Sequence, residues 1–212
     1  MSTQGLLVRM HAKHDKERAV EDLLHSALRS VQDEPGTLAW FAVRFGRTDF
    51  GIFDVFADDA AREAHINGAA ALELKRRASD LFETPPHIES IDVLADKLPI
   101  VSSETDTKGL LVTFKAKAGH ERDVERFLLE ARELVENERR TTAWFAIRTA
   151  RGEYGIFDVF PRNEDRFMHL VGQVPRELAK HALTLLGSVP ELEMVNVHAE
   201  KIGSTTHEAV KH

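Results

Sequence analysis

Apolar and polar residues recur with two different periods along the first half of the chain. Residues 6–11 alternate with a period of two, which predicts a β-strand. Residues 20–31 place apolar side chains every three or four positions, which predicts an amphipathic helix. Two runs of apolar, β-favouring residues follow at 38–45 and 50–56, and the short loop between them contains Gly46. These two runs predict a β-hairpin.

Helical spacing returns after the hairpin. It extends from about residue 59 to residue 82 and is interrupted near Gly68, and a last apolar run at 87–95 predicts a final strand. The predicted order is therefore βαββαβ, the ferredoxin-like arrangement, in which both helical segments cover one face of an antiparallel sheet.

The same unit occurs twice in the chain. Residues 5–98 align with residues 109–202 without a gap, and roughly two-fifths of the aligned positions are identical, against about one in twenty by chance. The segment from Gly51 to Phe56 is repeated unchanged at Gly155 to Phe160. We therefore predict a first domain at 1–98, a linker at 99–108, a second domain at 109–202 and a flexible tail at 203–212.

The hairpin strands are apolar on both faces, which is unexpected for a sheet with one face in water. Trp40 and Ala42 lie opposite Phe41 and Val43, and helices can cover only one of these two faces. The equivalent sheet of the other copy is the simplest cover for the second face. The predicted fold class is α+β, with two ferredoxin-like βαββαβ repeats packed sheet to sheet. The chain would then be an intramolecular pseudo-dimer, and its further association into a homodimer is left open.

Composition and charge exclude several kinds of partner. The chain lacks cysteine, which excludes disulfides and thiolate sites and favours a reducing compartment, so we expect a cytoplasmic protein. The net charge of -7 is spread along the chain, and no basic patch is available for nucleic acid. No apolar run approaches membrane-spanning length. We expect neither nucleic acid nor a membrane as partner, but a small-molecule substrate or ligand.

Motifs for bound cofactors are also missing from the sequence. It contains no glycine-rich phosphate loop, no nucleophile elbow and no H-x-H or H-E-x-x-H pattern. We therefore expect no metal site and no cofactor, with haem held by a single axial histidine as the alternative.

Histidine and tryptophan occur at matching positions in both copies. His65 and His169 are the only histidines that align with each other, and both fall in the helical segment after the hairpin. A neutral imidazole there would deprotonate a phenolic substrate and so prepare it for dioxygen; the alternative is a histidine hydrogen-bonded for structure. Trp40 and Trp144 would line a substrate-binding pocket, or else belong to the core.

Asp54 and Asp158 each interrupt an apolar strand, where a buried carboxylate is unfavourable unless it is paired or its pKa is raised. Arg44 and Arg148, on the neighbouring strand of the hairpin, are the expected countercharges and candidate substrate-binding residues. The aspartates are thus candidates either for structural ion pairs or for acid–base catalysis.

Each copy resembles the antibiotic biosynthesis monooxygenase (ABM) domain, of the dimeric α+β barrel superfamily. The resemblance rests on Glu34–Thr37, on Gly51–Phe56 with its single carboxylate, and on Asp58, Asp59, Arg62, Ala64 and His65. The second copy keeps Asp158, Arg166 and His169 but has Arg139 and Arg140 in place of the Pro-Gly pair. The resemblance implies a dimeric α+β barrel formed within one chain, with pockets between sheet and helices.

Three functions are compatible with these features. The resemblance implies a cofactor-independent monooxygenase acting on a small aromatic, quinol or polyketide-like substrate, with the aligned histidines and aspartates as catalytic residues. The alternatives are a haem-binding or haem-degrading protein, and a non-catalytic module that binds a small ligand or a partner.

Overall fold

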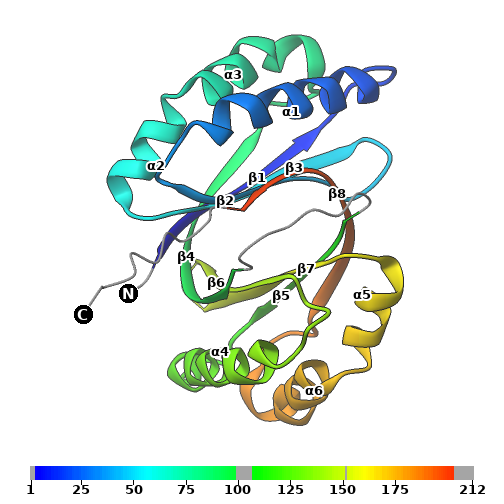
Figure 1. Ribbon diagram of the computed structural model, residues 1–212. Helices are drawn as coiled ribbons and strands as arrows, with labels where there is room; N and C mark the ends of the chain where they lie inside the picture. The colour runs from blue at the N-terminus through cyan, green and yellow to red at the C-terminus, as the bar shows by residue number, and fades with distance from the viewer. Residues whose placement is uncertain (1–2, 99–106, 151, 203–212) are drawn as a thin grey trace, which may run out of the picture.

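The chain is built from two βαββαβ repeats, which the computed structural model arranges as two helical layers with the strands between them (Figure 1). The structure describes residues 3–98, 107–150 and 152–202. The first repeat contains β1 (Thr3–His11), α1 (Glu17–Gln32), β2 (Thr37–Arg44), β3 (Asp49–Phe56), α2 (Asp59–Ile66), α3 (Ala69–Leu81) and β4 (His87–Lys97). The second contains β5 (Lys108–Lys115), α4 (Glu121–Glu136), β6 (Ala143–Ala150), β7 (Glu153–Phe160), α5 (Asn163–Leu170), α6 (Gln173–Leu185) and β8 (Glu191–Ile202). The predicted element order is confirmed in both repeats, and in each of them the second helical segment is divided into two helices.

The predicted linker and tail fall largely on residues that the structure does not describe. Lys108, the last residue of the predicted linker, is the first residue of β5, and residues 99–106 lie outside the described part of the chain. The predicted tail at 203–212 lies outside it as well. Among the described residues, no helix is both long and apolar enough to cross a membrane.

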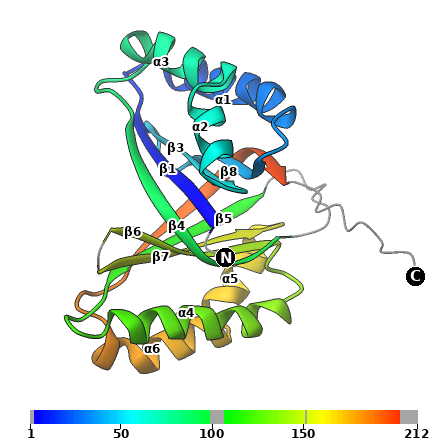
Figure 2. The same cartoon turned by 90° about the vertical axis from the view of Figure 1, so that its left-hand side faces the viewer.

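The strands of the two repeats join into one closed antiparallel barrel, in the order β1-β3-β2-β8-β5-β7-β6-β4. The last strand of each repeat pairs on one side with the first strand of its own repeat and on the other with the second strand of the other repeat. In the turned view β4 and β8 extend between the two helical layers (Figure 2). The predicted fold class is confirmed, and the sheets are joined at both edges as well as packed face to face.

Aromatic side chains from both repeats fill the interior of the barrel. Phe53 and Phe157 stack with their ring centroids 4.3 Å apart, and Phe145 lies 5.1 Å from Phe53. All three are at most 1% exposed. On the outer face of the first sheet, Trp40 and Ile52 pack against apolar side chains of the helices. Both faces of the hairpin strands are therefore covered, one by the other repeat and one by helices, which confirms the reason predicted for their apolar pattern.

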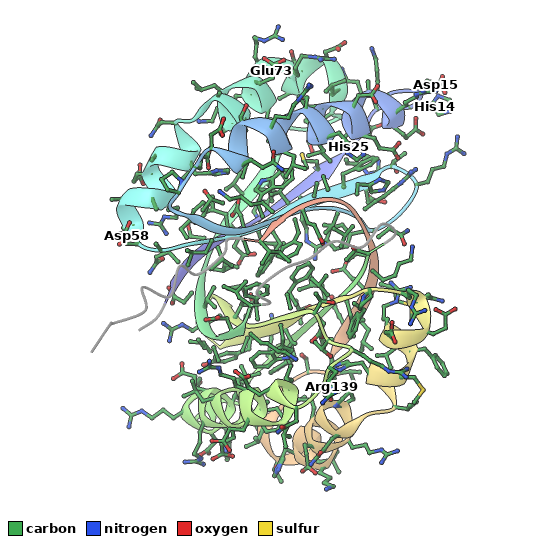
Figure 3. All side chains as sticks on the ribbon, viewed as in Figure 1. His14, Asp15, His25, Asp58, Glu73 and Arg139 are labelled. Atoms are coloured by element: carbon green, nitrogen blue, oxygen red, sulfur yellow. The ribbon has the colours of Figure 1, made fainter. Side chains whose placement is uncertain are left out.

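The short helix α2 brings a second set of side chains onto the outer face of the first sheet. Asp58, labelled in Figure 3, caps the helix because its carboxylate accepts a hydrogen bond from the backbone N–H of Ala61 at 2.8 Å. Gly68 separates α2 from α3 at the predicted position. This break lets α2 lie across β3 while α3 packs beside α1.

Candidate active site

Asp54 is a buried carboxylate on β3. Alternation along the strand turns Phe53 and Val55 into the barrel, whereas Asp54 lies on the outer face beneath the helices. It is 1% exposed, and its Oδ1 accepts a hydrogen bond from the backbone N–H of Leu6 at 3.1 Å. Burial raises the pKa of Asp54, because the charged carboxylate is disfavoured away from water, although the contact with His65 opposes this rise.

His65 on α2 links Asp54 to a second carboxylate. Its Nε2 lies 3.3 Å from Oδ2 of Asp54, and its Nδ1 lies 2.6 Å from Oε2 of Glu34 in the loop after α1. The hydroxyl of Thr37 donates to the same glutamate oxygen at 2.7 Å. Glu34, His65 and Asp54 thus form a continuous chain that we call the first polar chain.

The charge of His65 follows from these two neighbours. Burial by itself would lower the pKa of the imidazole, but the hydrogen bonds and charges of Asp54 and Glu34 outweigh burial and raise it to about 9. At neutral pH the ring is therefore an imidazolium, which cannot accept a proton. This charge differs from the neutral imidazole that is expected from the sequence at His65.

A cavity of about 310 Å³ opens beside the first polar chain, between the outer face of the sheet and helices α1, α2 and α3. Its walls are apolar apart from Asp54, His65 and Lys75. Trp40, which lies opposite Asp54 on β2, lines the same cavity. Three predicted site residues of the first repeat, the aspartate, the histidine and the tryptophan, therefore meet at one cavity.

The predicted arginine–aspartate ion pairs are wrong. In the hairpin Asp54 lies opposite Trp40, and Arg44 lies opposite Phe50, four residues farther along β2 or roughly 13 Å away at the usual strand rise. Arg44 instead pairs with Glu21 of α1 and donates to two backbone carbonyl groups. It does not line the cavity.

Arg148 in the second repeat is also engaged elsewhere. Its guanidinium lies 2.6 Å from Asp92 of β4 and 2.9 Å from Glu125 of α4. Because Asp92 belongs to the first repeat, this arginine contributes to the contact between the repeats. It does not form an ion pair with Asp158.

The second repeat contains a corresponding polar chain of Glu138, His169 and Asp158, which we call the second polar chain. Nδ1 of His169 lies 2.7 Å from Glu138, but its Nε2 lies 3.8 Å from Asp158. The Oδ1 atom of Asp158 has no hydrogen-bond partner among the described residues. Burial raises the pKa of Asp158 to about 7 and, despite the burial of the ring, the nearby carboxylates raise the pKa of His169. Trp144 is fully buried beside Asp158.

Sequence reasoning missed the glutamates and threonines of the two polar chains. Glu34 and Thr37 align with Glu138 and Thr141, and the threonine hydroxyl donates to the glutamate in both repeats. Their identity between two otherwise diverged copies was the available signal. The loop from α1 to β2 has no periodicity, so nothing in the pattern placed these side chains beside a helix that follows later.

Among the described residues, no group of three or more His, Asp or Glu side chains is arranged to hold a metal ion. Both ring nitrogens of His65 contact carboxylates, so neither is free to bind haem iron from this position.

The fold and site define the chain as a dimeric α+β barrel whose two subunits are fused. A family model described as "Antibiotic biosynthesis monooxygenase" matches residues 4–77. No curated protein sequence is significantly similar to the chain. Residues 4–77 of the first repeat thus match the ABM family, and the second repeat aligns with the first without a gap.

Two solved structures have the same fold over nearly the whole chain. A proposed monooxygenase from Fusobacterium nucleatum has a TM-score of 0.87 at 16% identity, over 96% of this chain and 95% of that one. Another from Lactobacillus acidophilus has a TM-score of 0.80 at 12% identity, over 94% and 96%. A protein of unknown function from Nitrosomonas europaea is 48% identical over 47% of this chain and 96% of its own, with a TM-score of 0.46.

Proposed function

We propose that the first repeat oxygenates a small phenolic polycycle with dioxygen and without a bound cofactor. The observation that carries the proposal is the first polar chain, which presents a buried carboxylate and an imidazolium to a cavity whose other lining residues, except Lys75, are apolar. The match of residues 4–77 to the ABM family supports the reaction class. The apolar walls and Trp40 fit a flat aromatic substrate.

Asp54 is the proposed base and His65 the group that stabilises the anion. The carboxylate of Asp54 removes a proton from the acidic methylene of an anthrone-type substrate, whose negative charge spreads onto its ring oxygen. The imidazolium of His65, held between two carboxylates, faces the same cavity and favours that negative charge. Because Asp54 and His65 are buried, the interaction is stronger there than in solution.

The reaction needs no external reductant. The substrate anion gives one electron to dioxygen, and the resulting radical and superoxide combine through a new carbon–oxygen bond. The protonated Asp54 returns its proton to form a hydroperoxide. Removal of the second methylene proton by Asp54 then forms the carbonyl as the oxygen–oxygen bond breaks, and the departing hydroxide takes that proton to become water. In sum, a methylene group and O2 give a carbonyl group and H2O.

Lys75 suggests that the substrate carries an acidic substituent. Asp54 is buried at one end of the cavity, whereas Lys75, Pro85 and Ile88 are exposed and mark its opening. No described residue forms an ion pair with Lys75. We propose that the phenolic rings enter first and that a carboxylate on the substrate stays at the opening, beside this ammonium group.

Oxygen uptake with 1,8-dihydroxyanthrone tests the proposed reaction. We expect consumption above the non-enzymatic rate, with one atom of ¹⁸O2 in the new carbonyl and the other in water. Tight binding without added oxygen uptake would contradict the oxygenase and leave the ligand-binding module as the function.

Binding of 1-naphthol and 1-hydroxy-2-naphthoate, measured by fluorescence, tests the role of Lys75. Lys75→Ala should weaken the naphthoate about fivefold and leave naphthol unchanged. Arg76→Ala is the matched control, because Arg76 lies on the same helix but pairs with Glu73 and does not line the cavity. Equal effects of Lys75→Ala on both ligands would refute the acidic substituent.

A further inference from the structure

Each polar chain is attached to a lysine that comes from the other repeat. Lys201, near the end of β8, donates from Nζ to the backbone carbonyl of Val31 at 2.7 Å and to that of Glu34. Lys97, near the end of β4, donates in the same way to Val135 at 2.8 Å and Glu138 at 2.7 Å. The exchange of last strands in the barrel is what brings each lysine to the opposite repeat.

All four carbonyl groups also accept a backbone N–H, and each lysine adds a second, charged donor to its two carbonyls. The last carbonyls of a helix have no partner within the helix, and the negative end of its dipole lies there, so an ammonium group is well placed. The loop is a tight one, in which the backbone N–H of Glu34 bonds to Val31 at 3.1 Å and that of Thr37 bonds to Glu34 at 3.2 Å. Lys201 therefore holds the turn from Val31 to Glu34 at both of its ends.

The backbone that Lys201 holds belongs to the residue that orients the site histidine. The Glu34 carboxylate is the partner of Nδ1 of His65, and the ring presents its other nitrogen to Asp54. A displacement of the loop by a fraction of an ångström would lengthen the 2.6 Å contact with Glu34 and release the ring.

We propose that Lys201, from the second repeat, is a positioning residue of the first polar chain, and that Lys97 from the first repeat holds the second polar chain. The site of each repeat is incomplete until the other repeat supplies its last strand. The duplication thus completes the site as well as covering the sheets. Only the catalytic consequence of Lys201 rests on the proposed oxygenase function.

The charges around these groups come from several elements. Lys201 faces Glu34 and Asp33 at the end of α1, and burial lowers its pKa although these carboxylates oppose the change. His65 faces Asp54 from β3 and Glu34 from the loop. A lost contact between His65 and Glu34 should therefore lower the pKa of His65, because one of the two carboxylates that raise it would be removed.

Histidine-selective NMR titration of the full chain tests this arrangement without any substrate. Lys201→Met should lower the pKa of His65 by about one unit and remove the exchange-protected Nδ1–H signal of this ring, leaving His169 unchanged. Lys97→Met is the matched control and should affect His169 alone. Lys201→Arg, which can still donate to both carbonyls, should restore His65. An unchanged His65 in Lys201→Met would overturn the proposal, as would equal changes of both histidines in either methionine variant.

If Lys201→Met does not fold, Lys201→Arg and Lys201→Gln provide the comparison. The glutamine keeps a donor but not the charge, so His65 should shift by less than half a unit in this variant, and a larger shift in the arginine variant would refute the assignment. With an anthrone substrate, Lys201→Met should lower kcat about tenfold with KM within twofold, and Lys97→Met should change neither. Absence of wild-type turnover would refute the oxygenase function and leave the titration result intact.

Discussion

The two repeats share a polar chain but differ in how completely its aspartate is held. The contact between histidine Nδ1 and glutamate is 2.6 Å in the first repeat and 2.7 Å in the second. The contact between Nε2 and aspartate is 3.3 Å in the first and 3.8 Å in the second. Asp54 also accepts from the backbone of Leu6, whereas Oδ1 of Asp158 has no partner among the described residues. The contact that ties the helix to the loop is thus nearly the same in both repeats, whereas the contact between histidine and aspartate is longer in the second.

The residues that surround the two polar chains also differ between the repeats. The first faces a cavity of about 310 Å³, and two of its lining residues, Leu23 and Ala71, align with Phe127 and Pro175 in the second repeat. Phe127 packs against the core of its repeat. The second polar chain borders a different hollow of about 360 Å³, which is lined by Glu138, Thr141 and His169 but not by Asp158. The polar chain therefore ties a helix to a loop in both repeats, and in the first repeat its aspartate also lines a cavity.

Removal of the proposed base should have the largest effect. Asp54→Asn should lower the rate of anthrone oxygenation at least about 100-fold, because the amide cannot accept the substrate proton. Asp158→Asn should leave the rate within twofold, since its repeat has bulkier residues at the cavity positions. Oxygen electrode measurements on both variants decide this, with circular dichroism to confirm folding. Equal losses in the two variants would mean that both repeats carry out the reaction.

The loop that holds the glutamate should tolerate substitution unequally in the two repeats. A Cβ atom at Gly36 would lie 2.5 Å from that of Ala61, so Gly36→Ala should reduce the free energy of unfolding by about 3 kcal/mol. The aligned pair in the second repeat is Arg140 and Asp165, an ion pair at 3.3 Å. Arg140→Ala should reduce the free energy of unfolding by less than about 1 kcal/mol, because this arginine is largely exposed. Urea unfolding measures both, and similar losses would show that α2 can move away from the loop.

The stability of the second repeat should depend on pH through Asp158. Its pKa is about 7 in the folded protein and near 4 when unfolded, so between these values the folded state holds the extra proton and stability falls as pH rises. His169, whose folded pKa is also raised, loses its contribution in the same direction as pH rises through that pKa. Relative to wild type, Asp158→Asn should therefore gain about 2 kcal/mol between pH 5 and pH 8. Urea unfolding curves with the same difference at both pH values would rule out a raised pKa.

Exchange of one lining residue should sharpen the contrast between the cavities. Leu23→Phe places the residue of the second repeat into the cavity of the first, where it should weaken 1-naphthol binding about tenfold with little change in the melting temperature. Fluorescence titration and thermal unfolding give the two readings. Unchanged affinity would locate the ligand outside this cavity.

Much of the fold could be predicted, because the internal repeat can be read directly from the sequence. The strand and helix periods of apolar residues within each copy are local features of the sequence as well. The break at Gly68 and the apolar faces of the hairpin were visible for that reason. The pairing of β4 with β6 and of β8 with β2 could not be predicted from the sequence. Strand patterns show which face of a strand is buried but not which neighbouring strand its edge pairs with. Only the presence of two apolar faces hinted that the repeats depend on each other.

The site was predictable residue by residue but not as a network. Asp54 and His65 stood out as a carboxylate in an apolar strand and a histidine kept in both copies. The predicted pairing of Asp54 with Arg44 is wrong, because the order of strands alone does not give their register. Nor does it place the helix that carries His65 beside Asp54. Glu34 lay in a loop whose position depends on α1, on α2 and on a lysine from the far end of the chain.

The exchange of last strands also fixes the order in which the molecule can be completed. Pairing of β2 with β8 joins residues 39–44 to residues 196–202, so the first repeat lacks this neighbouring strand and its lysine until β8 has been synthesised. Contacts so distant in sequence close slowly, because a long loop must be ordered first. The first repeat is synthesised early, but its site would be among the last parts of the molecule to form.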